Sequence, residues 1–232
     1  IFLNLIMNED ENFFRNENVT IATGSLRRKA QWLHRYPSHK ITGLRGNVIT
    51  RLKKLDDNQW DGAIFAKAGL RRLNLLPEQE KQLVLDWMVP APAQGAVMIA
   101  ALENDAELLE LCAEINHKET ATCVKIERDF LRILEGGCTA PIGALAMIIK
   151  EEVKFKGVLF SPDGKDKMEF SKTVPEENAW DLGEYAANYI LERGGKKLMR
   201  DIIDIEKSTL VYSTKSLSHD QTAILNSRIG VK

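Results

Sequence analysis

The sequence predicts two consecutive structural units, an α/β unit built on a parallel sheet and an α+β unit built on an antiparallel sheet. In the first third of the chain, short β-branched runs alternate with helical patterns, as in strands that crossover helices join in parallel. Two longer helical patterns follow, and behind them comes a stretch that alternates apolar and polar residues. The length of 232 residues suits two ordinary domains, each with its own core.

The first unit repeats the order strand, loop, helix. Its first repeat has a strand at Val19–Ala22, a Gly-Ser turn, and a helix that ends near Tyr36, because Pro37 disfavours helix at the residue before it. The apolar opening, "IFLNLIM", predicts a further strand. The other predicted elements of this unit are a strand over 40–44, a helix over 48–59, a strand over 62–67 and a helix that begins at 68.

The second unit follows a proline-punctuated connector, "MVPAPAQGAVMIAAL", whose apolar end predicts another strand. Apolar residues at helical spacing then predict two helices that end at Gly136 and Gly137. The remaining predicted elements are three strands over 142–174 with "SPDGKD" as a hairpin turn, a helix over 179–193 that stops at Gly194-Gly195, and a strand, loop and helix over 208–232 that open a further domain.

The composition argues against several classes of function. Basic and acidic residues number 32 and 33, so the net charge predicts no nucleic-acid partner. The three cysteines, Cys112, Cys123 and Cys138, form no CxxC pair and have no histidines at metal spacing, so we expect no metal site and a reducing, cytoplasmic location. The apolar opening is too short to span a bilayer, so we expect no membrane partner. We expect surface positions for the four histidines, His34, His39, His117 and His219.

Arginines follow each of the three predicted parallel strands. They are Arg27 and Arg28, Arg45 and Arg51, and Arg71 and Arg72. The carboxyl ends of parallel strands share one edge of a sheet, and ligands of such sheets bind there. Arginine pairs with carboxylates and phosphates through two parallel hydrogen bonds and stays charged. Each arginine taken alone is more simply a solvated residue near a helix start, but their repetition in three successive units predicts a site for a polyanionic ligand.

Cys138 lies in the small loop "LEGGCTAPIG", between a glycine pair and a proline. Cys112 and Cys123 lie among apolar residues at helical spacing, which predicts small buried side chains. A glycine-flanked loop instead leaves a sulfur accessible. If positive charge lowers the pKa of its thiol, Cys138 can serve as a nucleophile or as an attachment point.

The chain closely resembles the porphobilinogen deaminases, also called hydroxymethylbilane synthases, over about residues 1–205. The resemblance rests on six motifs in the same order and spacing, "GSLRRKAQ", "LRGNVITRLKKL", "DGAIFAKAGLRRL", "PAPAQGAV", "NHKETATCVKIERDFL" and "LEGGCTAPIGALA". It implies a transferase of tetrapyrrole and heme biosynthesis, which joins four porphobilinogen molecules into a linear pyrrole chain with loss of ammonia. It also implies that Cys138 holds, through a thioether, a dipyrromethane cofactor on which the chain grows.

The resemblance implies a role for further residues and a domain division. The residues implied to bind the carboxylates of cofactor and substrate are Ser25, Arg27, Arg28, Arg45, Arg51 and Arg72. The implied division is a carboxylate-binding α/β domain at 1–88, similar in fold to periplasmic binding proteins, a connector at 89–105 that in the family returns to the first domain, a cofactor-attachment α+β domain with helices on one face of its sheet at 106–205, and an extension at 206–232.

The chain departs from the family pattern in three respects. The family's first domain, with its catalytic aspartate, falls upstream of Ile1, so we expect little turnover and an apolar surface that favours self-association. Gly24-Ser25 replaces a usual pair of hydroxyl residues, which removes one expected hydrogen bond to a ligand. The tail resembles the first strand and helix of a uroporphyrinogen-III synthase, and a plain extension is the alternative.

Two other interpretations stay open at this point. A non-catalytic anion-binding module explains the arginines but leaves Cys138 unexplained. An RNA-binding protein explains "SLRRKA" and "RLKK", and its affinity would fall steeply with salt.

Overall fold

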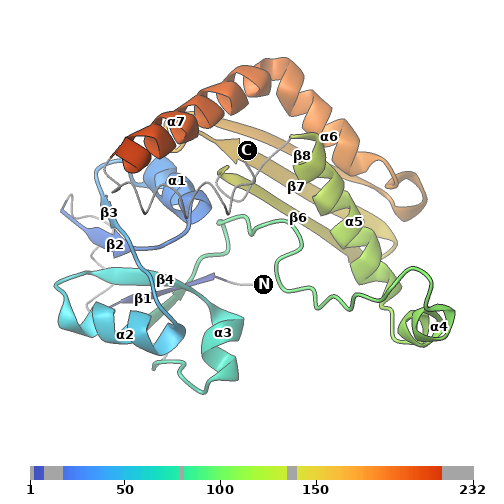
Figure 1. Cartoon of the computed structure of the whole chain (residues 1–232), viewed down its shortest axis with the longest axis horizontal. Helices are drawn as coiled ribbons and strands as arrows, with labels where there is room; N and C mark the ends of the chain where they lie inside the picture. The colour runs from blue at the N-terminus through green and yellow to red at the C-terminus, as the bar shows by residue number, and fades with distance from the viewer. Residues whose placement is uncertain (1–2, 8–17, 79–80, 135–139, 216–232) are drawn as a thin grey trace.

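The structure is a computed structural model that describes residues 3–7, 18–78, 81–134 and 140–215. Figure 1 shows two lobes joined by an extended connection. The first lobe holds a five-stranded sheet with α1–α3, and the second holds a three-stranded sheet with α4–α7. This division into an α/β lobe and an α+β lobe confirms the predicted fold class.

The sheet of the first lobe has the strand order β3-β2-β4-β1-β5. Its strands are β1 (Leu3–Met7), β2 (Thr20–Ala22), β3 (Lys40–Thr42), β4 (Gly62–Ala66) and β5 (Gln82–Val84). The strands of the three predicted repeats, β2, β3 and β4, pair in parallel. The predicted opening strand β1 lies between β4 and β5 and runs antiparallel to both, so the sheet is mixed. Strand β5 was not predicted, because three residues show no readable alternation.

Both faces of this sheet are buried. One face packs Ile21 and Ile64 against Trp32 of α1, and the other packs Ala22 and Phe65 beneath α2 and α3. Successive strand residues point to opposite faces, so strands buried on both sides read as continuous apolar runs. The helices are α1 (Leu26–Arg35), α2 (Val48–Asp57) and α3 (Lys67–Arg72).

The predicted strand in the connector is wrong. Residues 86–105 form no strand, although Val97, Met98, Ile99 and Leu102 have the apolar character of one. These four side chains are exposed, and Val97 is 95% exposed. A strand needs a neighbouring strand and a buried face, and the described part of the chain provides neither for this segment.

The second lobe has an antiparallel meander of three strands in the order β6-β7-β8. Its elements are α4 (Ala106–Glu114), α5 (Lys118–Ile133), β6 (Ile142–Ile149), β7 (Glu152–Phe160), β8 (Lys167–Pro175), α6 (Leu182–Ile190) and α7 (Lys196–Lys215). Phe130 of α5, Phe155 of β7 and Ala186 of α6 share its core. The two predicted helices, the three strands and the hairpin turn are confirmed.

The predicted helix stop at Gly194-Gly195 is confirmed, but this helix is not the last one. Arg193 and Gly194 have non-helical backbone angles, with Gly194 at φ 110°, and α7 begins directly behind this kink. A glycine at positive φ ends the first helix and lets the chain turn into the second. Residues 208–215 are helical and not the predicted strand, which removes the pattern behind the tail's resemblance to a uroporphyrinogen-III synthase. The rest of that tail lies outside the described residues.

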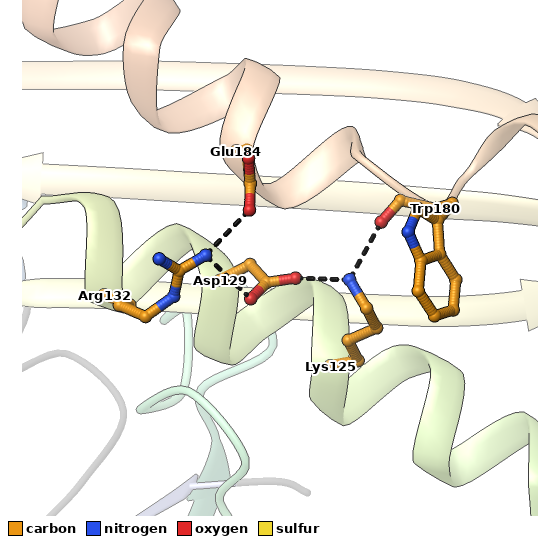
Figure 2. A network of polar contacts seen from close by, with 5 residues as sticks. All are labelled: Lys125, Asp129, Arg132, Trp180 and Glu184. Atoms are coloured by element: carbon orange, nitrogen blue, oxygen red, sulfur yellow. Dashed lines mark hydrogen bonds and ion pairs between the residues drawn. The ribbon is translucent and has the colours of Figure 1, made fainter.

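Helices α5 and α6 are joined by a surface network of charges (Figure 2). Asp129 accepts from Lys125 Nζ at 2.6 Å and lies 3.4 Å from Arg132 Nη2, which also lies 2.7 Å from Glu184 Oε1. Lys125 also donates to the carbonyl of Trp180 at 3.1 Å and lies 4.1 Å from the centre of its ring. Exposed pairs of this kind contribute up to about 1 kcal/mol each, so the buried contact beneath them decides the stability of this packing.

That buried contact depends on Gly183. A Cβ added at Gly183 would lie 2.1 Å from the carbonyl oxygen of Ile126 in α5. The two helix backbones therefore approach more closely than any side chain at this position allows.

We expect Gly183→Ala to lower the free energy of unfolding by about 1–3 kcal/mol, because the new methyl group forces the helices apart. Gly69→Ala is the matched control, since nothing lies within 4 Å of its added Cβ inside α3. This control should raise stability by about 0.5–1 kcal/mol through the lower entropy of the unfolded chain. Urea unfolding followed by circular dichroism measures both values, and equal effects of the two substitutions would contradict the proposed close approach.

Candidate functional site

The loops behind β2, β3 and β4 meet at one edge of the first lobe. The three strands are parallel, so their carboxyl ends point the same way. The amide of Thr23 donates to the carbonyl of Thr42 at 2.9 Å, which extends the pairing of β2 and β3 beyond the strands themselves. A Cβ added at Gly24 would lie 2.5 Å from the carbonyl oxygen of Leu44, so the first two loops touch. The first two of the three loops are therefore in contact, and the parallel strand β4 ends at the same edge.

Arg27 lies in the first turn of α1 and is buried, with 7% of its surface exposed. Its Nη1 donates to the carbonyl of Val89 at 2.6 Å, and its Nη2 donates to Oε1 of Gln94 at 3.1 Å. Both acceptors belong to the connector between the lobes. The guanidinium group therefore joins the edge of the first lobe to the segment that leads into the second.

Arg28 reaches across the sheet edge from the same turn of α1. Its Nη1 donates to the carbonyl of Ile64 in β4 at 2.9 Å. Its Nε is buried and has no hydrogen-bond partner in the described part of the chain. Ser25 caps the helix, since its hydroxyl oxygen accepts from the Arg28 amide at 3.4 Å. Buried donors in proteins normally have an acceptor, so the Nε of Arg28 is left unsatisfied among the described residues.

Burial and a neighbouring positive charge destabilise each of the two arginines as a cation. Burial, and then the charge of Arg28, lower the pKa of Arg27 from 12.5 to about 9. Burial, and then the charge of Arg51, lower the pKa of Arg28 from 12.5 to about 10. Both groups remain protonated at neutral pH. Among the described residues neither forms an ion pair with an aspartate or glutamate, so their positive charge is available to an anion.

The other predicted arginines lie farther out. Arg51 is half-buried in α2, donates from Nε to the carbonyl of Gly46 at 2.7 Å and is close enough to lower the pKa of Arg28. Arg45 is exposed in the loop between β3 and α2, and Arg72 is exposed in the last turn of α3. The structure thus gathers Ser25, Arg27, Arg28 and Arg51, while no described contact links Arg45 or Arg72 to them.

Two glutamines, the buried Gln31 and the half-buried Gln94, were missed by the sequence analysis. Gln31 lies one turn behind Arg27 in α1 and exchanges two hydrogen bonds with the backbone of Val89. Gln94 accepts from Arg27 and from the amide of Ala91. The spacing of four residues between Arg27 and Gln31 places them on one helix face, and that spacing is the available signal. The spacing does not show which groups the two side chains bind.

Cys138 itself lies outside the described residues, as does His219. Both ends of its loop are anchored, because Leu134 is buried at the end of α5 and Pro141 is buried at the start of β6. The amide of Ala144 in β6 donates to the carbonyl of Pro90 at 3.0 Å. The base of the loop therefore lies beside the connector residue that follows the Val89 contact of Arg27.

The remaining cysteines and histidines play structural parts. Cys123 is half-buried and packs on the core of the second lobe, where burial raises the pKa of its thiol. Full burial was predicted for Cys112, but its side chain on α4 is only half-buried. The surface position predicted for His39 is wrong, because its Nδ1 accepts from the indole of Trp32 at 3.3 Å inside the first lobe. The described residues contain no cluster of metal-binding side chains.

Glu127 of α5 fastens the connector to the second lobe. Its two carboxylate oxygens accept from the amide of Ala93 at 2.6 Å and from the amide of Ala146 in β6 at 2.8 Å. Burial raises the pKa of this carboxyl group, although the two amides favour its charged form. Glu127 is thus committed to the backbone, and we assign it no role toward a ligand.

We expect a polycarboxylate to stabilise the chain through the arginine edge. Citrate should raise the melting temperature by about 2–4 °C above that in sodium chloride of equal ionic strength, the shift that about 1 kcal/mol of binding gives at this size. Arg28→Met should remove most of this difference, because it deletes a half-buried cation that has no acidic partner among the described residues. Arg200→Met, on the exposed side of α7, should keep it. Differential scanning calorimetry decides, and an undiminished shift in Arg28→Met would count against the site.

Family models match both lobes of the chain. The model described as "Porphobilinogen deaminase, dipyromethane cofactor binding domain" matches residues 5–110. The model described as "Porphobilinogen deaminase, C-terminal domain" matches residues 121–192. The two matches follow the order of the lobes. None of the helices in the described ranges is long and apolar enough to span a membrane.

Curated relatives agree with the family models. A porphobilinogen deaminase of Syntrophotalea carbinolica is 37% identical over 195 residues, which are 84% of this chain and 62% of that protein. One of Staphylococcus aureus is 38% identical over 79% of this chain and 60% of its own length. The chloroplastic porphobilinogen deaminase of Pisum sativum is 41% identical over 75% of this chain and 48% of its own length. The chain therefore spans about half to three fifths of the length of the relatives that it matches.

The family models match the two lobes in order, and the curated relatives carry the same family name. The chain belongs to the porphobilinogen deaminase family.

Proposed function

We propose that this chain contributes the cofactor-binding and chain-holding part of a hydroxymethylbilane synthase. In this reaction four porphobilinogen molecules are joined head to tail, and each addition releases ammonia. Every pyrrole carries an acetate and a propionate, so the growing product gains negative charge at each step. The observation that carries the proposal is the pair of the buried Arg27 and the half-buried Arg28, which has no acidic partner in the described part of the chain.

The residues present fit a dipyrromethane that bears four carboxylates. The buried Nε of Arg28 lacks an acceptor, and the Arg51 charge lies close by. Arg45 and Arg72 are exposed and are proposed to meet carboxylates farther along a growing chain. When bound, the cofactor supplies the free pyrrole carbon to which the next unit is joined.

The residues of this chain then have three tasks. Cys138 holds the cofactor through a carbon–sulfur bond, for which the thiol loses its proton. Arg27 and Arg28 neutralise the carboxylates in a poorly hydrated place, where a charge-assisted hydrogen bond is stronger than in water. Ser25 orders the first turn of α1 by capping it, and this turn carries Arg27 toward the connector and Arg28 toward β4.

We further propose that the carboxylate for proton transfer is not among these residues. Glu127 is occupied by two backbone amides, and the arginine edge contains no carboxylate in the described part of the chain. The portion of the relatives that this chain does not match would supply that group. On this proposal the 232 residues alone turn over little porphobilinogen.

A non-catalytic anion-binding module is the second candidate, because the arginine edge serves it equally well. It differs in its prediction for Cys138, which would then stay a free thiol. An RNA-binding role is disfavoured, because Arg27 and Arg28 of "SLRRKA" point into the lobe and not outward along a basic surface.

Covalent loading of Cys138 tests the enzyme proposal. We expect the chain, co-expressed with the unmatched N-terminal portion of the Staphylococcus aureus relative, to gain the mass of two linked pyrroles and to colour with Ehrlich's reagent. Cys138→Ser should abolish the gain, and Arg27→Leu should lower it strongly, because the cofactor carboxylates lose a buried cation.

Cys112→Ser and Cys123→Ser are the matched controls, and both should load as the unaltered chain does. Intact-mass spectrometry with peptide mapping measures all four variants. A free thiol at Cys138 in the co-expressed chain would favour the binding module, and normal loading of Arg27→Leu would refute the role of that residue.

The exposed apolar surface of the connector and α4 is proposed to be a docking surface. Val97, Met98 and Ile99 line a groove of about 700 Å³ together with Cys112 of α4 and Val124 of α5. Helix α4 buries no side chain completely, and Leu111 and Ile115 are exposed on it. A patch of this extent seldom faces water in a monomer. We propose that the remainder of a full-length family member covers it and that copies of this chain associate through it when that remainder is absent.

We expect the isolated chain to self-associate at micromolar concentration, and the double substitution Val97→Asp with Met98→Asp to yield monomers, because two charges would enter the contact. Ile49→Asp is the control, since Ile49 is equally apolar and exposed but lies on α2. Sedimentation velocity gives the masses. A monomeric parent chain, or monomers produced by Ile49→Asp as well, would contradict this surface.

A further inference from the structure

Side chains of α1 bind both the backbone amide and the backbone carbonyl of Val89. Gln31, which is 3% exposed, accepts from the Val89 amide at 2.8 Å through Oε1 and donates to the Val89 carbonyl at 2.9 Å through Nε2. The same carbonyl also accepts from Nη1 of Arg27 at 2.6 Å. One backbone residue of the connector is therefore bound by two side chains from one face of α1.

The next connector residue is bound from the other lobe. The carbonyl of Pro90 accepts from the amide of Ala144 in β6 at 3.0 Å. A Cβ added at Gly143 would lie 3.1 Å from that same oxygen and from the Cβ of Val89, so β6 and the connector are in close contact. Consecutive residues thus link α1, with its arginines, to the strand that begins just behind the Cys138 loop.

Each acceptor that Arg27 uses has a second donor. The Val89 carbonyl also accepts from the side-chain Nε2 of Gln31, and Oε1 of Gln94 also accepts from the backbone amide of Ala91 at 3.2 Å. If Arg27 left both acceptors for a ligand carboxylate, neither oxygen would lose its last partner. Leaving a buried polar group unsatisfied costs about 1–3 kcal/mol, and this arrangement avoids that cost.

We propose that Gln31 is a positioning residue that holds Val89 by itself, so that Arg27 can transfer from the connector to a ligand carboxylate while β6 stays attached to the arginine edge. This inference rests on the proposed function, because it assumes that carboxylates bind at that edge. Gln31 does not touch the ligand. It makes Arg27 available and keeps the base of the Cys138 loop in place.

Gln31→Met tests the proposal, because it preserves the length of the side chain and removes both hydrogen bonds. The Val89 carbonyl then depends on Arg27, so recruiting Arg27 costs a hydrogen bond. We expect calorimetry to show citrate binding about tenfold weaker, and hydrogen exchange to show the amides of Val89 and Ala144 exchanging about tenfold faster. The amides of the β7–β8 ladder should keep their protection. Lys29→Met on the same helix is the control and should change neither quantity.

Gln31→Glu is the second variant, in case Gln31→Met does not fold. It keeps an acceptor for the Val89 amide but brings a carboxylate next to Arg27, so citrate affinity should fall below that of Gln31→Met. Wild-type citrate affinity in either variant would overturn the inference, as would faster exchange spread equally over the β7–β8 ladder. Absence of citrate binding to the unaltered chain would instead refute the proposed carboxylate site. Hydrogen exchange at Val89 and Ala144 would then test only whether Gln31 holds Val89 in place.

Discussion

Two neighbouring guanidinium groups lie out of water without a carboxylate among the described residues, and the rest of the site depends on this constraint. Burial removes hydration from Arg27 and Arg28, and a neighbouring cation adds repulsion, Arg28 for Arg27 and Arg51 for Arg28, as the lowered pKa of each shows. The protein offsets part of this with neutral carbonyl and amide acceptors. Neutral acceptors fix the direction of the groups and leave their charge uncompensated. An acidic partner would have held them as firmly, but an incoming anion would then have to displace it.

The parts of this site that follow local rules could be predicted from the sequence. Ser25 and Pro37 mark the ends of α1, and the parallel order of three strand–helix repeats places their loops at one edge. The hydrogen bonds of Arg27 could not be predicted, because its partner Val89 lies 62 residues away. Gln31 looked like an ordinary helix residue for the same reason, since its role depends on where the connector runs.

The failed predictions have a common physical cause. The apolar segment around Val97 has the residue types of a strand, but residue preference does not produce one without a neighbour to pair with. The strand predicted at the start of 208–232 also lacks a neighbour, and residues 208–215 continue α7 instead. In both cases the absence of a pairing strand in the described part of the chain decided against the local signal. The Cys138 loop remains a prediction, because it lies outside the described residues.

The place of β1 in its sheet also determines the order in which the first lobe can form. The earliest strand of this chain lies between β4 and β5 and pairs with residues as late as Val84. During synthesis from the amino end, β1 has no permanent neighbour until those later strands have left the ribosome. Such distant pairing slows folding and prolongs the time during which an apolar strand needs protection. The first lobe is therefore expected to depend on chaperones more than the locally paired meander of β6, β7 and β8.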